Sequence, residues 1–226
     1  MPLLMCDLDD TLVVRPPIFR AWAEAFLAER GRPDLLAWVV EQDGGGHRPR
    51  EEFLAAVAAE TGYDAPPDRF RREYDAQVAD RYRTTPDTRQ ALASAREHGW
   101  SIAIVTNGPT AGQGRKVRAA GLGPLVDAVC ISEEVGVRKP DPVIFETAAE
   151  RAGSTLDGAW MVGDSLDADV AGAHAVGASA AWLPRAWDPL EHTSGARPEL
   201  VSESFAEAVG AILASRPAPG RAPASG

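Results

Sequence analysis

Lysine is the scarcest charged residue of this chain, and positive charge as a whole is in deficit. Only two of the 23 basic residues are lysines, Lys116 and Lys139, and the 226 residues carry a net charge of −10. An excess of negative charge opposes binding to nucleic-acid phosphates and to anionic membranes. We therefore expect neither a nucleic acid nor a membrane as a partner.

Long apolar runs and cysteines are also scarce. No apolar stretch reaches the roughly 20 residues that cross a bilayer, and the N-terminus turns acidic too soon for a secretion signal. The two cysteines, Cys6 and Cys130, lie inside apolar runs and are expected to be small buried residues in a reducing compartment. These features predict a cytoplasmic protein and give no indication of its oligomeric state.

Short apolar runs alternate with helical patterns along most of the chain. The expected strands are 2–6, 101–107, 125–132, 159–164 and 180–184. The expected helices are 85–99, a weaker one after residue 107 that ends around Gly121, 141–153, 166–177 and 202–214. Strands that alternate with helices form a parallel sheet covered on both faces. The sequence therefore predicts a doubly wound α/β core.

Residues 16–84 interrupt this alternation. Their apolar residues recur at helical spacing, without the two-residue period of a strand. We predict an all-helical insertion at 16–84, a core made of 1–15 and 85–215, and a disordered tail at 216–226. The aromatic residues expected in the core of the insertion are Trp22, Trp38, Phe53, Phe70 and Tyr74.

Polar residues follow the predicted strands, at the edge where an open parallel sheet binds its ligands. Several carboxylates without histidine or thiolate are typical of a Mg²⁺ site. An extended backbone would place Asp7 and Asp9 on the same side, so that Asp7 could attack phosphorus and Asp9 could protonate the leaving oxygen and then deprotonate water. Asp10 would point away and have a structural role, such as capping the turn with Thr11.

Four stretches resemble the motifs of haloacid dehalogenase-like (HAD) phosphohydrolases with an inserted helical cap. DLDDTL resembles the first motif, IVTNG the second, VRKPDP the third and GDSLDAD the fourth, and the resemblance covers nearly the whole chain. It implies a Rossmann-like core, a cap that closes over the site and a bound Mg²⁺ ion.

The resemblance also implies a role for each matching residue. Asp7 would be the nucleophile and Asp9 the acid and base. Thr106 and the amide of Asn107 would bind the phosphoryl oxygens, and Lys139 would counter the charge of nucleophile and phosphate. The metal ligands implied are Asp7, the backbone carbonyl of Asp9, Asp164 and, through the water shell of the metal, Asp169.

The two lysines receive different interpretations. Lys139 follows Arg138 in a chain that uses arginine almost everywhere, which indicates that a compact ammonium group is required at this position. Lys116 falls in a polar helical segment, and we expect it on a solvated face.

The loop GGGHRPR, residues 44–50, joins two helices of the insertion. Either it is a flexible turn, or it reaches into the site and contacts the substrate, as the resemblance to capped HAD enzymes implies. In the second case the candidate substrate-binding residues are His47, Arg48 and Arg50, with Arg15 and Arg20 as weaker candidates.

Taken with the resemblance, the sequence predicts a Mg²⁺-dependent phosphatase that hydrolyses a small phosphorylated metabolite through an aspartyl-phosphate. Three alternatives stay open. A phosphomutase would use the same residues, a haloacid dehalogenase would need neither Asp9 nor a metal, and a non-catalytic binding protein could share the scaffold. The sequence does not indicate which metabolite is the substrate.

Overall fold

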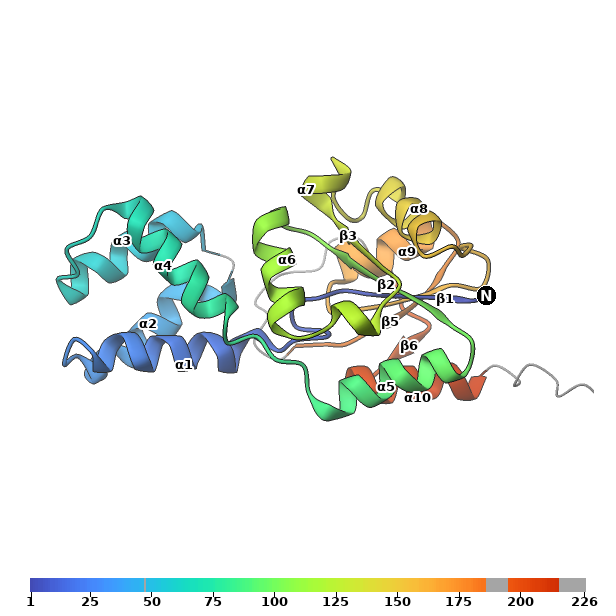
Figure 1. Ribbon diagram of the computed structural model, residues 1–226, viewed down its shortest axis with the longest axis horizontal. Coiled ribbons are helices and arrows are strands. Elements are labelled where there is room, and N and C mark those ends of the chain that lie inside the picture. The colour runs from blue at the N-terminus through green and yellow to red at the C-terminus, as the bar shows by residue number, and fades with distance from the viewer. Residues whose placement is uncertain (47, 186–194, 216–226) are drawn as a thin grey trace, which may run out of the picture.

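A computed structural model describes residues 1–46, 48–185 and 195–215 of the chain. Figure 1 shows a sheet with helices on both faces and, beside one end of the sheet, a separate group of helices. This is the predicted fold class, a doubly wound Rossmann-like α/β core with an inserted helical cap. The predicted disordered tail, 216–226, lies outside the described residues.

The sheet within the described residues consists of six parallel strands in the order β3-β2-β1-β4-β5-β6. The central strand β1 pairs with β2 on one side and with β4 on the other, so the direction of winding reverses between β1 and β4. Such a switch point is where open α/β sheets bind ligands. The strands are β1 (Leu3–Cys6), β2 (Ser101–Thr106), β3 (Ala128–Ile131), β4 (Trp160–Gly163), β5 (Ser179–Trp182) and β6 (Leu200–Val201).

Helices cover both faces of the sheet (Figure 1). Leu4 and Ile102 pack in the cluster that contains α5 and α10, and Met5 and Val105 in the one that contains α8 and α9, because successive residues of a strand point to opposite faces. The core helices are α5 (Pro86–Glu97), α6 (Thr110–Ala119), α7 (Ser132–Val135), α8 (Pro142–Arg151), α9 (Ala171–Ala175) and α10 (Phe205–Ser215), with a π-helical turn (Leu166–Val170) before α9.

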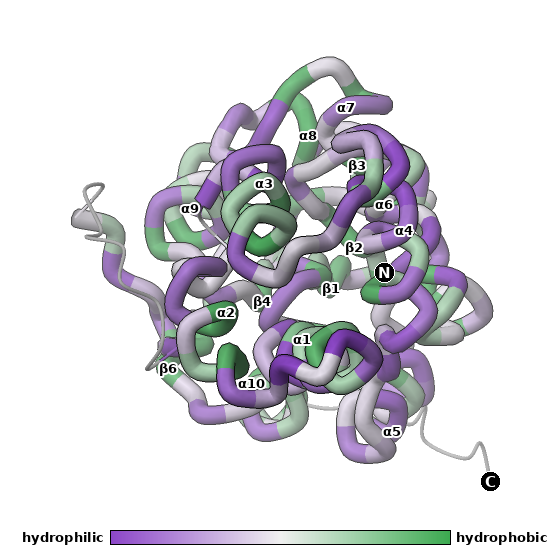
Figure 2. The backbone as a smooth tube through the Cα atoms, turned by 90° about the vertical axis from the view of Figure 1, so that its left-hand side faces the viewer, coloured by the Kyte–Doolittle hydropathy of each residue, from purple (hydrophilic) through white to green (hydrophobic). Residues whose placement is uncertain are grey.

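The inserted cap is helical, as predicted. Its helices are α1 (Arg15–Ala28), α2 (Leu36–Asp43), α3 (Arg50–Thr61) and α4 (Pro67–Ala79). Figure 2, a view from the cap side, shows hydrophobic and hydrophilic residues around the turns of α1 and α3, as expected for helices with one buried face.

Aromatic side chains hold the cap helices together. The rings of Trp22 and Tyr74 lie 4.7 Å apart in an edge-to-face contact, and those of Phe26 and Phe70 stack at 5.2 Å. Each such pair contributes about 0.5–1.5 kcal/mol beyond the burial of its area. Of the five aromatic residues predicted for this core, four are buried, and Trp38 is partly buried against it.

Two chain segments link the cap to the core. After β1 the chain makes a compact turn, in which the backbone N–H groups of Leu12 and Val13 donate to the Leu8 carbonyl at 3.1 and 3.0 Å. On its return, Thr84 Oγ1 donates to the Leu12 carbonyl at 3.0 Å, inside the protein. The linkers are therefore joined to each other at the entrance to the core. The exact limits of the cap, 16–84, stay a prediction.

The structure also describes both cysteines and the character of the helices. Cys6 and Cys130 are both free and fully buried. Over the part of the chain that the structure describes, no helix combines the length and the apolar character that a membrane span requires.

Candidate active site

Asp7 leaves the central strand β1 and meets the ammonium group of Lys139. The Lys139 Nζ atom donates to Asp7 Oδ1 at 2.5 Å and to Asp169 Oδ1 at 2.6 Å. Burial alone would lower the pKa of Lys139, but Asp169 and Asp7 outweigh it and hold this pKa above its usual value. Lys139 is therefore a fixed positive charge between two carboxylates.

Asp164 completes a cluster of carboxylates at the switch point. It follows β4, which pairs directly with β1, so the sheet brings Asp164 close to Asp7. Ligand oxygens of Asp7, Asp164 and Asp169 all lie within 4.8 Å of one another. Burial, with Asp7 and Asp169 nearby, raises the pKa of Asp164 to about 9. Burial also raises the pKa of Asp7, even though Lys139 opposes the shift.

These three residues fit a Mg²⁺ ion. The set contains only oxygen ligands, and one or two carboxylates of this kind are how proteins commonly hold Mg²⁺. The crowding that raises the pKa of Asp164 is the repulsion that a bound cation would relieve. Asp7, Asp164 and Asp169, three of the residues in the predicted ligand set, therefore lie close enough together to surround one ion.

Asp9 lies in the turn after β1 and is bound by helix α6. Lys116 Nζ lies 2.6 and 2.8 Å from the two carboxylate oxygens of Asp9, and Gln113 Nε2 donates to the same carboxylate at 3.0 Å. Burial would raise the pKa of Asp9, but Lys116 outweighs it and keeps this pKa below its usual value. The prediction of a solvated face for Lys116 was therefore wrong, because its side chain reaches into the site and is only 20% exposed.

The chain does not stay extended after Asp7, as the sequence argument assumed, because residues 8–13 form the compact turn. Asp7 and Asp9 nevertheless line the same cavity. Asp10 was expected to point away from the site, but it lines this cavity too. It caps a turn as expected, although its partner is Arg15 and not Thr11. In a left-handed conformation with φ 56°, it accepts a hydrogen bond from the backbone N–H of Arg15, the first residue of α1, at 2.7 Å.

Thr106 and Asn107 end strand β2 on the same edge. The Thr106 hydroxyl is buried and accepts a hydrogen bond from Gln113 Nε2 at 2.6 Å. The Asn107 side chain donates to the Lys139 carbonyl at 3.1 Å and accepts from the Lys139 N–H at 2.9 Å. Asn107 thereby fixes the backbone that carries Lys139, a contact that the sequence did not indicate.

A cavity of about 400 Å³ opens over these residues. Its walls include Asp7, Asp9, Thr106, Asn107, Lys139, Asp164 and Asp169 from the core, and Arg15, Gly45, Gly46 and Arg50 from the cap. The predicted core residues therefore converge at one place, and Gly45, Gly46 and Arg50 bring both ends of the 44–50 loop to it.

The three loop candidates differ in position. Arg50 lines the cavity, whereas the Arg48 side chain donates to Gln42, and Arg48 is not among the residues that line the cavity. His47 lies outside the described residues. Of the weaker candidates, Arg15 lines the cavity and Arg20 is exposed beside Glu24.

Arg15 and Arg50 share one buried carboxylate, Asp43. Arg15 contacts both of its oxygens at 2.7 and 2.8 Å, and Arg50 contacts one of them at 2.8 Å. Asp43 is only 2% exposed, and although burial would raise its pKa, Arg15 keeps this pKa low. This cluster fixes the two guanidinium groups at the cap wall of the cavity.

Comparisons with known proteins point to one family. A family model of haloacid dehalogenase-like hydrolases matches residues 1–177. Phosphoserine phosphatase from Thermus thermophilus is 32% identical, over 84% of this chain and 91% of that protein. Ribulose-1,5-bisphosphate 5-phosphatase from Halopiger xanaduensis is 33% identical, over 77% of this chain and 81% of that protein.

A solved structure shows the same fold with a different chemistry. The L-2-haloacid dehalogenase from Xanthobacter autotrophicus superposes with a TM-score of 0.69 at 20% identity, over 94% of this chain and 98% of that chain. The fold alone does not separate a phosphatase from a dehalogenase. The family match and the two curated relatives are stronger, and the chain belongs to the haloacid dehalogenase-like hydrolases. Its likeness to the curated phosphatases confirms the resemblance drawn from the sequence.

Proposed function

We propose that this protein is a Mg²⁺-dependent phosphatase that hydrolyses a small phosphorylated metabolite through an aspartyl-phosphate. The main support is one contact. The buried Lys139 ammonium bonds Asp7, which also belongs to a cluster of three carboxylates suited to a metal. Phosphoric monoester hydrolysis is the activity that both curated relatives share by name. A cytoplasmic location is part of the proposal, since the two cysteines are free.

In the first step Asp7 attacks the phosphorus atom and becomes the aspartyl-phosphate. Lys139 offsets the charge of Asp7 and of the incoming phosphoryl group, and Thr106 and the Asn107 amide bind phosphoryl oxygens. A bound Mg²⁺ ion, held by Asp7, the Asp9 carbonyl and Asp164, would supply further positive charge to these oxygens.

Asp9 carries the proton transfers. It would protonate the leaving oxygen in the first step and deprotonate the water that cleaves the aspartyl-phosphate in the second. Gln113 donates to both the Asp9 carboxylate and the Thr106 hydroxyl. It therefore holds the residue proposed as acid and base next to a residue proposed to bind the phosphoryl group. A phosphomutase would use the same groups and differs only in returning the phosphoryl group to a substrate.

A screen for phosphate release tests the proposal directly. The wild-type protein with Mg²⁺ is incubated with a panel of phosphorylated metabolites and with p-nitrophenyl phosphate, and free phosphate is measured. Release from at least one metabolite supports a phosphatase. Conversion of a sugar phosphate to its isomer, without net phosphate release, would instead identify a mutase.

Removal of the metal is expected to abolish turnover. Exhaustive chelation should remove phosphate release, and Mg²⁺ should restore it. Binding gives an independent measurement, because a saturating ligand at 100 times its Kd stabilises the folded state by about 2.7 kcal/mol. Mg²⁺ should raise the Tm of the wild type but not that of Asp164→Asn. Full activity after chelation would contradict a metal-dependent reaction.

Replacing Asp9, the proposed acid and base, should show whether the protein is a phosphatase or a dehalogenase. Asp9→Asn keeps the shape of the side chain but cannot transfer the proton, so phosphatase turnover should fall by about 10²–10⁴-fold. A dehalogenase has no need of this carboxylic acid. Halide release from a 2-haloacid by the wild type, unchanged in Asp9→Asn, would favour the dehalogenase.

A further inference from the structure

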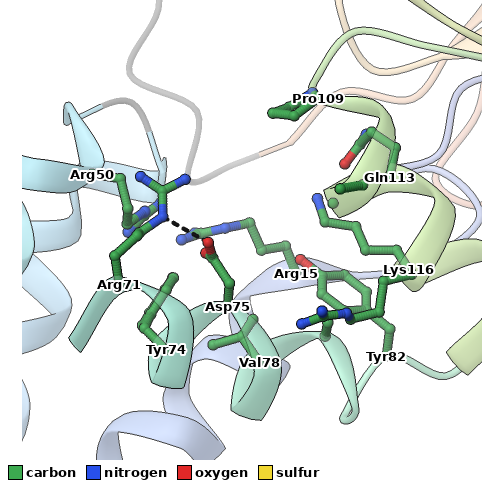
Figure 3. Close-up of a pocket in the computed structure, with 14 residues that line it drawn as sticks. Arg15, Arg50, Arg71, Tyr74, Asp75, Val78, Tyr82, Pro109, Gln113 and Lys116 are labelled. Carbon is green, nitrogen blue, oxygen red and sulfur yellow. Dashed lines mark hydrogen bonds and ion pairs between the residues drawn. The ribbon is translucent and has the colours of Figure 1, made fainter. Parts of the chain in front are cut away.

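A second cavity adjoins the proposed active site. It measures about 310 Å³ and lies between α4 of the cap and α6 of the core (Figure 3). Arg15, Arg50 and Lys116 line both cavities, so the two spaces lie on either side of these residues. We call the second cavity the cationic recess, and its lining is Arg15, Arg50, Arg71, Tyr74, Asp75, Val78, Ala79, Tyr82, Pro109, Ala111, Gly112, Gln113, Arg115 and Lys116.

The charge of this recess is opposite to that of the chain. Five of its lining residues are cationic and only one, Asp75, is acidic, in a chain whose net charge is −10. Positive charges that converge on a concave surface raise the local concentration of anionic ligands. Such an accumulation also destabilises the fold by mutual repulsion, which points to a functional use.

Internal partners do not neutralise all five cations. Arg15 and Arg50 share the single carboxylate of Asp43, which leaves one positive charge in excess. Arg115 is exposed, and its side chain has no hydrogen-bond or ion-pair partner within 1–46, 48–185 and 195–215.

Arg71 and Lys116 form ion pairs. The pairs of Arg71 are partly exposed to solvent, and the partner of Lys116 takes part in the proposed reaction. Arg71 pairs with Asp75, as the dashed line in Figure 3 shows, and with the highly exposed Glu51. Lys116 pairs with Asp9, the proposed acid and base. An incoming anion could therefore compete for both cations.

The position of Lys116 indicates which part of a substrate enters the recess. Its ammonium group bonds the carboxylate that would protonate the leaving oxygen, and it also stands 5.1 Å from the centre of the Tyr82 ring in the recess wall. The recess therefore adjoins the side of the active site where the leaving group would lie.

We propose that the cationic recess binds a second anionic group, carried by the leaving group of the substrate. The substrate class is then a small phosphate ester that bears either a carboxylate or a second phosphate. Both are planar or multidentate oxyanions that arginine binds with paired hydrogen bonds. This inference rests on the proposed phosphatase function. It adds that the group released from the phosphate carries an anionic group of its own.

Steady-state kinetics with matched substrates test the inference. Phosphoserine supplies a carboxylate, ribulose 1,5-bisphosphate a second phosphate, and glycerol 3-phosphate and p-nitrophenyl phosphate carry neither. For the wild type we expect kcat/KM to be at least about tenfold higher for one of the first two, the size of one charge-assisted hydrogen bond. Which of the two is preferred distinguishes the carboxylate from the phosphate.

Two variants and two matched controls locate the effect. Arg115→Ala and Arg71→Ala remove cations of the recess, whereas Arg118→Ala and Arg72→Ala remove exposed arginines of the same helices that do not line it. Each recess variant should lower kcat/KM for the doubly anionic substrate about tenfold. Hydrolysis of p-nitrophenyl phosphate should stay within about twofold, and the control variants should change neither substrate.

Three results would overturn the inference. Equal kcat/KM for all four substrates in the wild type would contradict it, as would equal losses for both kinds of substrate in the recess variants, or losses in the control variants of the same size. Each of these leaves the phosphatase function intact. Absence of phosphate release from every ester, p-nitrophenyl phosphate included, would overturn the proposed function itself.

Discussion

Replacing Asp7 by Asn is expected to reduce turnover by about 10⁴-fold or more, because the nucleophile of a covalent mechanism has no substitute. The variant keeps the shape of the side chain and can still accept a hydrogen bond from Lys139. It should therefore fold, and its Tm should stay close to that of the wild type. The measurements are kcat by phosphate release and the amount of phosphoenzyme after an acid quench.

The phosphoenzyme makes this experiment specific. The wild type should form an acid-stable, hydroxylamine-labile phosphoenzyme, and Asp7→Asn should form none. Asp157→Asn, a change of an exposed carboxylate in a turn, serves as the matched control and should leave both quantities unchanged. Covalent labelling that persists in Asp7→Asn would assign the nucleophile to another residue.

Removing the ammonium group of Lys139 is expected to impair both stability and turnover. In Lys139→Ala the carboxylates of Asp7 and Asp169 lose the cation that bonds both of them. Breaking a buried ion pair by removing one partner typically costs about 3–5 kcal/mol of unfolding free energy. Loss of one preorganised donor in the active site should reduce kcat by about 10²–10³-fold. Urea denaturation and phosphate release measure the two effects.

The variant Lys139→Arg tests why lysine occupies this position. One nitrogen atom contacts both carboxylates, and the side chain is only 3% exposed. A guanidinium group is larger and holds its donors in a fixed planar fork, which does not match this geometry. We expect arginine to restore the charge but not the turnover. Recovery of wild-type kcat in Lys139→Arg would show that charge alone is sufficient.

The sequence was sufficient to predict the features that follow from the hydrophobic pattern and from the order of the elements along the chain. Apolar runs located five of the six strands that the structure describes, and the polar residues after them include both Asp7 and Asp164. Because the strands that carry these residues are neighbours in the sheet, their carboxylates meet as expected. The short strand β6 escaped prediction, since two residues show no periodicity.

Contacts that depend on the rotation of a helix could not be predicted in this way. Gln113 and Lys116 are three residues apart in α6, a spacing that puts both on one face, but the pattern does not say which face meets the site. Asp43 meets Arg15 across 28 residues, and nothing local in the sequence indicates that contact. All of these residues are polar, and polarity alone predicts a side chain that faces solvent.

The hydrogen bond between Thr84 and Leu12 bears on how such a protein can change during evolution. Because the linkers meet at this bond, the segment between them begins and ends at nearly the same point. The pairing of β1 with β2 and β4 involves no residue of that segment. An exchange of the inserted helices for another module with equally close ends would leave the catalytic sheet whole. New substrate preferences can therefore arise by replacing one contiguous stretch of the gene while the chemistry is inherited unchanged.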